Sequence, residues 1–434
     1  MALQEGIYHA PGRRPGRHFA LLFLRVAPGV TAAAAAAALG DLWGMYQGLK
    51  AGLVRDLEGT MVPAGDDAMT VLLGFGRNAF ELDAIALERP RGLADEYLFR
   101  SAQEGGGGPL LRGSGLSYAP DVRANMATEA FCVQVIAESK LAVDRAVVET
   151  WKALADAEAP ALELTTFYLG NQRNDHRSWI DFHDGLSNLR SEDRESVIAI
   201  GPGTDEAWAV GGTYLAFMRL AVDLVGWRRL SRSEQELAVG RDKLTGCPVV
   251  GVGEDGAPRT DPGCPVAGTQ IHETPNDGPF AEPPEVEDPV VRASHVQRAN
   301  HHIRPASDFG SRRIFRQGYE FLEWAGGPPG FRAGLNFVSF QDTPSRLLKM
   351  MTAGGWLGGT NFGGYEDGRP ELASLLSVYG AGVYFVPPLV AGEPFPGASA
   401  LGVAVAPAPP EPVEPAAEAD PVTGGAIAPQ EPTG

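Results

Sequence analysis

Short, continuous apolar runs recur through the first third of the chain. Residues 18–26, 69–75 and 130–138 are mostly apolar and have the length of ordinary strands. A strand that is covered on both faces needs no polar alternation, so runs of this kind predict buried strands. We therefore expect three core strands in this part of the chain.

Two segments between and after these runs have helical character. Residues 31–50 are rich in Ala, Leu and Met, although three glycines weaken the second half of the segment. Residues 141–154 carry apolar side chains three or four positions apart, at Val143, Val147, Trp151 and Leu154. Residues 77–87 suggest a short helix or turn. The order strand, helix, strand, strand, helix predicts an α+β unit over residues 1–155, close to a ferredoxin-like sandwich with one strand unseen.

A second α+β unit is expected over residues 156–399. We expect strands at 162–168, 195–200, 213–224 and 334–341, and helices at 231–239 and 345–351. Ser231 or Ser233 would cap the first of these helices, because acidic residues follow in its first turn. Residues 247–289, rich in Pro, Gly and Asp, predict a loop. The two units look like a distant duplication without a residue-level repeat.

Charge restricts the partners of this chain. Its 434 residues include 36 Lys and Arg against 54 Asp and Glu, a formal net charge of −18. Binding to nucleic acid or to an anionic membrane surface depends on basic residues, so neither is expected. The apolar run at 30–39 is too short to cross a bilayer, and the segment before it is unlike a leader. We therefore expect a cytoplasmic protein.

The three cysteines, Cys132, Cys247 and Cys264, are few and widely separated. They form no CxxC pair of the metal-binding type, and three cysteines provide no disulfide framework for so long a chain. We expect buried or incidental thiols in a reducing compartment.

Residues 292–319 concentrate positive charge and histidine in this acidic chain. The segment contains Arg292, His295, Arg298, His301, His302, Arg304, Arg312, Arg313 and Arg316. Such a segment indicates a bound anion, a metal or both; the alternative is a solvated loop. The chain has no Walker loop, zinc motif or nucleophile elbow, and GVGEDG at 251–256 leads into residues that cannot open a helix.

A second polar segment, WIDFHDGLSN at 179–188, is either a plain turn or the partner of the basic segment. A neutral His295 imidazole could ligate haem iron. Asp184 could move a proton, and Arg316 could stabilise developing negative charge. Together the two segments contain the parts of a haem site.

In combination these segments resemble the dye-decolourising (DyP-type) haem peroxidases. The family's GxxDG motif is matched by DFHDG at 181–185, and its SHI-x-R-x-N segment by SHVQRAN at 294–300. Its RILRRG segment is matched by RIFRQG at 313–318, and its GLLFVxYQ strand by GLNFVSFQ at 334–341. The resemblance runs from about residue 3 to about residue 399, and leaves no room for a leader peptide.

The resemblance implies two ferredoxin-like sandwiches, with haem b held mainly by the C-terminal one. It makes His295 the proximal iron ligand and places Asp184 and Arg316 on the opposite face of the haem. Leu335 and Phe337 would line that distal pocket. The remaining histidines near these motifs match no ligand position, and we interpret them as structural or surface residues; they are His183, His301 and His302.

Three positions depart from the family pattern. Asp181 stands where the motif has Gly, and Asp tolerates only part of the backbone freedom of Gly. The loop therefore either differs from the family's or brings a second carboxylate near the haem edge. Gln317 replaces a usual Arg. Asn336 replaces a usual apolar residue, which puts the polarity of the pocket in question.

The implied activity is the oxidation of bulky aromatic or dye-like reductants by hydrogen peroxide, in one-electron steps. One alternative is a haem carrier or sensor of the same fold without turnover. Another is an α+β enzyme or interaction protein that binds a different anion and no haem.

Residues 400–434 are dominated by Pro, Ala and Glu and predict a disordered tail. The tail either keeps the protein soluble or acts as a tether that docks it in an encapsulin shell. A homo-oligomer is compatible with all of these.

Overall fold

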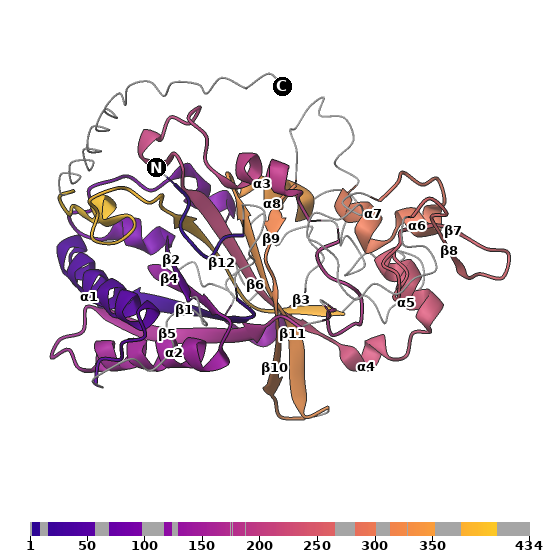
Figure 1. Ribbon diagram of the computed structural model, residues 1–434, viewed down its shortest axis with the longest axis horizontal. Coiled ribbons are helices and arrows are strands. Elements are labelled where there is room, and N and C mark those ends of the chain that lie inside the picture. The colour runs from indigo at the N-terminus through magenta and orange to yellow at the C-terminus, as the bar shows by residue number, and fades with distance from the viewer. Residues whose placement is uncertain are drawn as a thin grey trace, which may run out of the picture.

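The structure, a computed structural model, consists of a large sheet with helices packed around it (Figure 1). It describes residues 2–8, 16–56, 69–97, 117–123, 129–173, 175, 177–186, 188–264, 283–300, 313–327, 329–351 and 375–405.

Twelve strands and eight α-helices lie in the described part of the chain. The strands are β1 (His18–Val26), β2 (Thr70–Phe75), β3 (Ser117–Arg123), β4 (Phe131–Ala137), β5 (Leu162–Asn171), β6 (Thr213–Val222), β7 (Val249–Val252), β8 (Pro258–Thr260), β9 (Phe315–Arg316), β10 (Tyr319–Trp324), β11 (Phe331–Gln341) and β12 (Leu376–Val386). The helices are α1 (Ala32–Lys50), α2 (Lys140–Ala155), α3 (Ser191–Ile198), α4 (Leu224–Trp227), α5 (Arg232–Val239), α6 (Pro289–Arg292), α7 (His295–Asn300) and α8 (Ser345–Met351).

Strands from both halves of the chain form one sheet in the order β10-β5-β1-β4-β2-β12-β6-β11-β9, with β3 beside β12. β10 also pairs with β11, so the path from β10 to β11 closes on itself. β5, the strand predicted at 162–168 and assigned to the second unit, pairs along its length with β1 and so supplies the missing strand of the first unit. The predicted α+β class, built from ferredoxin-like antiparallel sheets, is confirmed.

β1 shows why the apolar runs are continuous. Ala20, Leu22 and Leu24 join the hydrophobic cluster under the helices, whereas the alternate residues Phe19, Leu21 and Phe23 join a second cluster on the other face. In this second cluster the Phe23 ring lies 5.6 Å from Phe217 and 5.8 Å from Tyr384, measured between ring centroids. Because both faces are buried, the strand has no polar positions to alternate.

The long helices cover one side of the sheet, and the short helices α4 to α7 gather at the other end of the molecule (Figure 1). α1 buries a single stripe at helical spacing, formed by Ala32, Ala35, Ala36, Leu39, Leu42 and Tyr46. Thr31, Ser139 and Ser231 cap the N-termini of α1, α2 and α5 with their hydroxyl oxygens. At Ser231 the cap is a full capping box with Glu234, so the prediction for this helix is confirmed.

Two secondary-structure predictions are wrong. The strand expected at 195–200 is the end of helix α3, whose first turn carries Glu192 and Asp193. Acidic residues at a helix N-terminus interact favourably with the helix dipole, which outweighs the short apolar run at its end. The loop expected at 247–289 contains the β7–β8 hairpin, and Pro289 begins α6.

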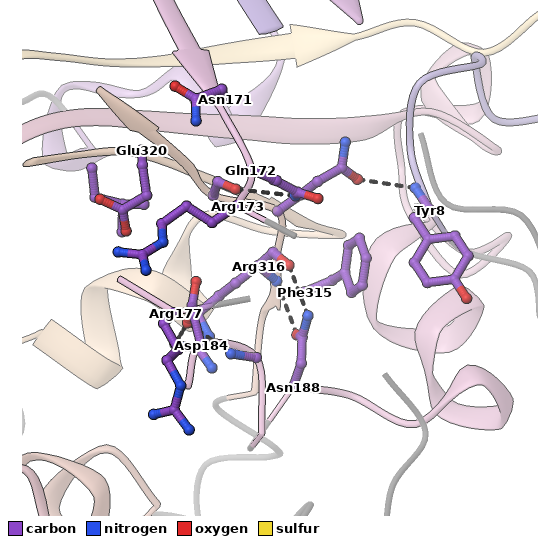
Figure 2. Close-up of a pocket in the computed structure, with 14 residues that line it drawn as sticks. Tyr8, Asn171, Gln172, Arg173, Arg177, Asp184, Asn188, Phe315, Arg316 and Glu320 are labelled. Carbon is purple, nitrogen blue, oxygen red and sulfur yellow. Dashed lines mark hydrogen bonds and ion pairs between the residues drawn. The ribbon is translucent and has the colours of Figure 1, made fainter. Parts of the chain in front are cut away.

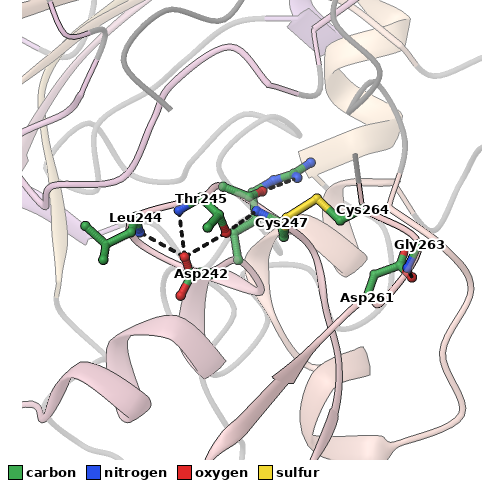
Figure 3. The surroundings of a disulfide bond; sticks show 9 residues. Asp242, Leu244, Thr245, Cys247, Asp261, Gly263 and Cys264 are labelled. Atoms are coloured by element: carbon green, nitrogen blue, oxygen red, sulfur yellow. Dashed lines mark hydrogen bonds between the residues drawn. A yellow bond between two sulfur atoms is a disulfide. The ribbon is translucent and has the colours of Figure 1, made fainter. Parts of the chain in front are cut away.

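The same hairpin overturns the expectation for two of the cysteines. Cys247 and Cys264 form a disulfide with their Cα atoms 5.9 Å apart, because the hairpin folds the chain back between them (Figure 3). Cys132 is a buried thiol, as expected. The cysteine content therefore no longer supports a reducing compartment. Among the described residues, no helix has the length and apolar character needed to span a bilayer.

Candidate functional site

A cavity of about 80 Å³ opens where the segment after β5 meets β9, β10 and β11 (Figure 2). Asp184, Arg316 and Leu335, which the sequence analysis had singled out, all line it. Asn171 and Glu320 contribute further polar side chains to the wall. A space of this size accommodates a few molecules as small as water, and nothing as large as a dye.

The loop that carries Asp184 is held by its own backbone. Arg177 and His183 form an isolated antiparallel bridge across it. Gly185 adopts a φ of +84°, and its N–H donates to the Asp184 carboxylate over 2.7 Å. His183 is buried and its Nδ1 lies 2.9 Å from the Asp184 carbonyl oxygen. His183 therefore supports the loop, in line with the structural role assigned to it.

Asp181 adopts the backbone conformation that the family's Gly would favour, with a φ of +69°. Asp is one of the few residues that visit this left-handed region readily. Its exposed carboxylate faces Lys243 at 3.8 Å and is not among the side chains that line the cavity. The turn is thus preserved, and Asp181 adds no second carboxylate to the cavity wall.

Arg316 lies on β9, where its neighbour across the sheet is Ser339 of β11. The Asn188 amide holds its backbone from the other side: Nδ2 donates to the Arg316 carbonyl over 2.7 Å, and the Arg316 N–H donates to Oδ1 over 3.1 Å. The guanidinium forms an ion pair with Asp184 at 3.9 Å, which is too long for a hydrogen bond. The structure therefore brings the predicted Asp–Arg pair together.

The other two departures from the family pattern serve the fold around the site. Gln317 is buried and joins β9 to the N-terminal segment, accepting from the Tyr8 N–H and donating to the Gly6 carbonyl. Asn336 points away from the cavity: it accepts from Arg219 over 2.6 Å and donates to the Leu169 carbonyl over 2.9 Å. Strand alternation turns Asn336 to the face of β11 opposite Leu335, so it adds no polar group to the cavity wall.

His295 begins helix α7 and is partly buried. Gly240, at the C-terminus of α5, has a φ of +89°, and a Cβ there would lie 2.3 Å from the hydroxyl oxygen of Ser294. This close approach fixes the start of α7 against α5. Burial of the ring and, after it, the positive charge of Arg316 lower the pKa of His295, while Asp184 raises it; the pKa comes to about 4. The imidazole is therefore neutral at pH 7. It also lies close enough to Asp184 and Arg316 for both charges to influence its pKa.

Leu335 and Phe337 lie on the same face of β11, because side chains two positions apart in a strand point the same way. Leu335 lines the cavity, whereas Phe337 packs against the hydrophobic cluster under the helices and is not part of the cavity wall. His301 and His302 lie outside the described residues.

Sequence reasoning missed two residues of this site, Asn188 and Glu320. Asn188 is the last residue of the segment 179–188, but its partner Arg316 lies 128 positions further along the chain. Glu320 is buried in β10, a strand that was not predicted. No local pattern could have revealed either contact.

Comparison with known proteins gives a consistent family signal. A family model described as Dyp-type peroxidase, C-terminal, matches residues 175–391. The dye-decolorizing peroxidase of Thermobifida fusca (strain YX) is 28% identical over 226 residues, which is 50% of this chain and 46% of the relative. The chain thus aligns with about half the length of this curated relative.

Solved structures show the same fold. Ferric DtpA from Streptomyces lividans superposes with a TM-score of 0.63 at 21% identity, over 93% of this chain and 98% of that one. A DyP-type peroxidase from Cellulomonas bogoriensis gives 0.61 at 20% identity, over 89% and 94%. A DypB variant from Rhodococcus jostii in complex with heme gives 0.56 at 16% identity, over 89% and 96%.

Proposed function

The chain belongs to the Dyp-type peroxidase family, and on that premise we propose that it is a haem peroxidase. It would use hydrogen peroxide to oxidise bulky aromatic or dye-like reductants in one-electron steps. One observation carries the proposal: Asp184 and Arg316 pair at the cavity wall, and both charges act on the imidazole of His295.

The residues around His295 suit haem b. A neutral imidazole is the form that ligates haem iron, and the lowered pKa of His295 keeps it neutral. Among the described residues, no three His, Cys, Asp or Glu side chains gather to hold a metal ion by themselves. When bound, haem supplies the electrons that reduce peroxide and regains them from the reductant.

Two side chains of the protein would have separate roles in the reaction: one transfers a proton and the other stabilises negative charge. Asp184 would accept a proton from a peroxide-sized molecule in the cavity and return it to the departing oxygen. Arg316 keeps its proton and stabilises the negative charge that develops. Asn188 holds the Arg316 backbone in place. The cavity is too small for a dye, so the reductant would bind elsewhere and its electrons would cross the protein.

An absorption spectrum after haem supplementation is the first test. We expect a Soret band in the wild type, and its loss from purified His295→Ala. His18→Gln is a matched control, because His18 lies at the start of β1 and should not affect haem retention. A wild-type protein without a Soret band would remove the proposal.

Two further variants separate a peroxidase from a haem carrier of the same fold. Asp184→Asn and Arg316→Leu should retain haem but slow the reaction with peroxide by roughly 100-fold or more. Asp205→Asn is the control, because Asp205 is exposed and pairs with Arg91 away from the cavity. Full activity in both site variants would contradict their roles, and a haem-loaded wild type without turnover would favour the carrier.

The tail at residues 400–434 suggests where the protein is located in the cell. Residues 406–434 lie outside the described residues. We propose that this tail tethers the protein inside an encapsulin shell in the cytoplasm. Deletion of residues 401–434 should then abolish co-purification with a shell, and unchanged co-purification would contradict it.

A further inference from the structure

Glu320 belongs to the same cavity as Asp184 but reaches it from the sheet. On β10 it is the register partner of Leu335 on β11 and of Asn171 on β5. All three side chains line the cavity, so three adjacent strands build this wall in register (Figure 2). Glu320 is therefore part of a built surface, with its position set by strand pairing on both sides.

The two carboxyl groups of the cavity have different surroundings. Asp184 has a 45% exposed side chain, faces Arg316 and accepts from the Gly185 N–H. Glu320 is only 7% exposed and accepts a hydrogen bond from the backbone N–H of Trp179. Within the described part of the chain, no Lys or Arg forms an ion pair with Glu320.

The charged groups that face Glu320 come from the segment after β5 and from β9. They are Arg173, Arg177 and Asp184 from the first and Arg316 from the second. The arginines have closer partners: Arg173 donates to Asp175 over 3.0 and 2.7 Å, Arg177 donates to backbone carbonyls, and Arg316 pairs with Asp184. None of these arginines forms an ion pair with Glu320, and of the three only Arg173 lowers its pKa, as the weakest of the causes.

The balance of these effects favours the neutral acid. Burial, and after it the negative charge of the Asp184 carboxylate, raise the pKa of Glu320, which comes to about 8. The Trp179 hydrogen bond and the positive charge of Arg173 only partly oppose this. Of two neighbouring carboxyl groups, the one without water and without a cation is the one that keeps the proton.

We propose that Glu320 is a second carboxyl group of this cavity that acts on Asp184, a carboxylic acid that stays protonated beside the Asp184 carboxylate. With Glu320 neutral and Asp184 ionised, the two carboxyl groups present a single negative charge to Arg316. Glu320 acts through Asp184 as a positioning residue. Its ionisation would place a second negative charge in the cavity and would compete with Asp184 for the positive charge of Arg316.

The protonation of Glu320 does not depend on haem, although its consequence for turnover rests on the proposed function. The infrared C=O stretch of a protonated carboxylic acid reports it directly in the full-length protein, with or without added haem. We expect one such band at pH 6.5 that disappears with a midpoint near pH 8. The band should be absent from Glu320→Gln and present in Glu163→Gln, whose carboxylate is exposed on β5.

The pH dependence of stability provides a second measure of whether Glu320 is protonated in the folded protein. The folded protein keeps a proton on Glu320 that the unfolded chain loses above its ordinary pKa of 4.5. Unfolding therefore releases a proton between about pH 4.5 and about pH 8, so stability falls as the pH rises through this window and levels off above it. Relative to Glu320→Gln, the unfolding constant of the wild type should rise about tenfold per pH unit there.

Several outcomes would overturn the proposal. They are a missing band at pH 6.5, a band that survives in Glu320→Gln, or a midpoint near 4.5. The infrared titration of the wild type alone decides the question if Glu320→Gln does not fold. If the protein binds haem and turns over peroxide, Glu320→Gln should also remove a step near pH 8 from the pH profile. Absence of haem binding would refute the proposed function and leave the infrared result to decide on Glu320.

Discussion

The first sandwich and the surroundings of the cavity are held together by different forces. β1, α1 and α2 are fixed by apolar faces that pack on both sides of the sheet. The loop with Asp184, the β9 strand and the segment before α6 are held by amide clamps, arginine–carbonyl contacts and a disulfide. Packing depends on many replaceable contacts, whereas each polar contact has a single partner. A mutation near the cavity should therefore alter the site before it unfolds the protein.

The largest effect should come from the sandwich. Phe23 is completely buried between Tyr168, Phe217 and Tyr384, so Phe23→Ala should lower the free energy of unfolding by about 3–5 kcal/mol. Denaturant unfolding measures this directly. Leu141→Ala is the control, because Leu141 is 65% exposed on α2 and should change stability by less than about 0.5 kcal/mol. A small loss at Phe23 would contradict the description of a jointly packed core.

Removal of the disulfide should lower the free energy of unfolding nearly as much as Phe23→Ala, but the loss of structure should be confined to the region around the bridge. Cys247 and Cys264 are 17 positions apart and pack against Leu186, two residues from Asp184. Loss of a bridge over a loop of this length costs roughly 3 kcal/mol in the chain-entropy account. The double variant Cys247→Ala/Cys264→Ala should increase amide exchange in the hairpin and in the loop that carries Asp184, while β1 and β4 stay protected.

A reducing agent provides the control for the disulfide. It should reproduce the exchange pattern of the double variant in the wild type and should have no effect on the double variant. Uniform loss of protection across the sheet would show that the bridge supports the whole fold and would contradict the contrast between the two regions.

The Asn188 clamp should have an intermediate effect. Asn188→Ala removes both hydrogen bonds to the Arg316 backbone and leaves its N–H and C=O without these partners, at a cost of roughly 1–3 kcal/mol. Asn188→Asp keeps the acceptor for the Arg316 N–H and should lose less. If the proposed function holds, the rate of reaction with peroxide should follow the same order. Wild-type stability and rate in Asn188→Ala would show that Arg316 needs no clamp.

The same contrast explains what the sequence could predict. β1 and α8 have the predicted bounds, because a double-sided apolar run and a short helical segment are local signals. The hairpin that brings Cys247 to Cys264 lies in a segment rich in turn-forming residues, and no local pattern marks it. The chemistry of the two polar segments suggested that Asp184 and Arg316 act together, and the resemblance to a family placed both on one face of the haem. Contacts between residues more than a hundred positions apart have no periodicity to reveal them.

The two regions also differ slightly in the non-glycine residues that adopt a left-handed backbone conformation. Ala84 in the first sandwich has a φ of +62°, and Asp181 beside the cavity has a φ of +69°. Ala has no polar side chain to support this conformation, so Ala84→Gly should stabilise the protein by about 0.5–1 kcal/mol once the entropy of Gly is subtracted. Asp tolerates the region better, and its exposed pairing with Lys243 contributes little.

Asp181→Gly should therefore leave the free energy of unfolding almost unchanged in denaturant melts in which Ala84→Gly is stabilised. A gain at Asp181 as large as the gain at Ala84 would mean that the aspartate strains the loop that carries Asp184. In that case the departure from the family's Gly would cost stability beside the cavity, and the rate of reaction with peroxide in Asp181→Gly would show whether that strain affects the Asp184–Arg316 pair.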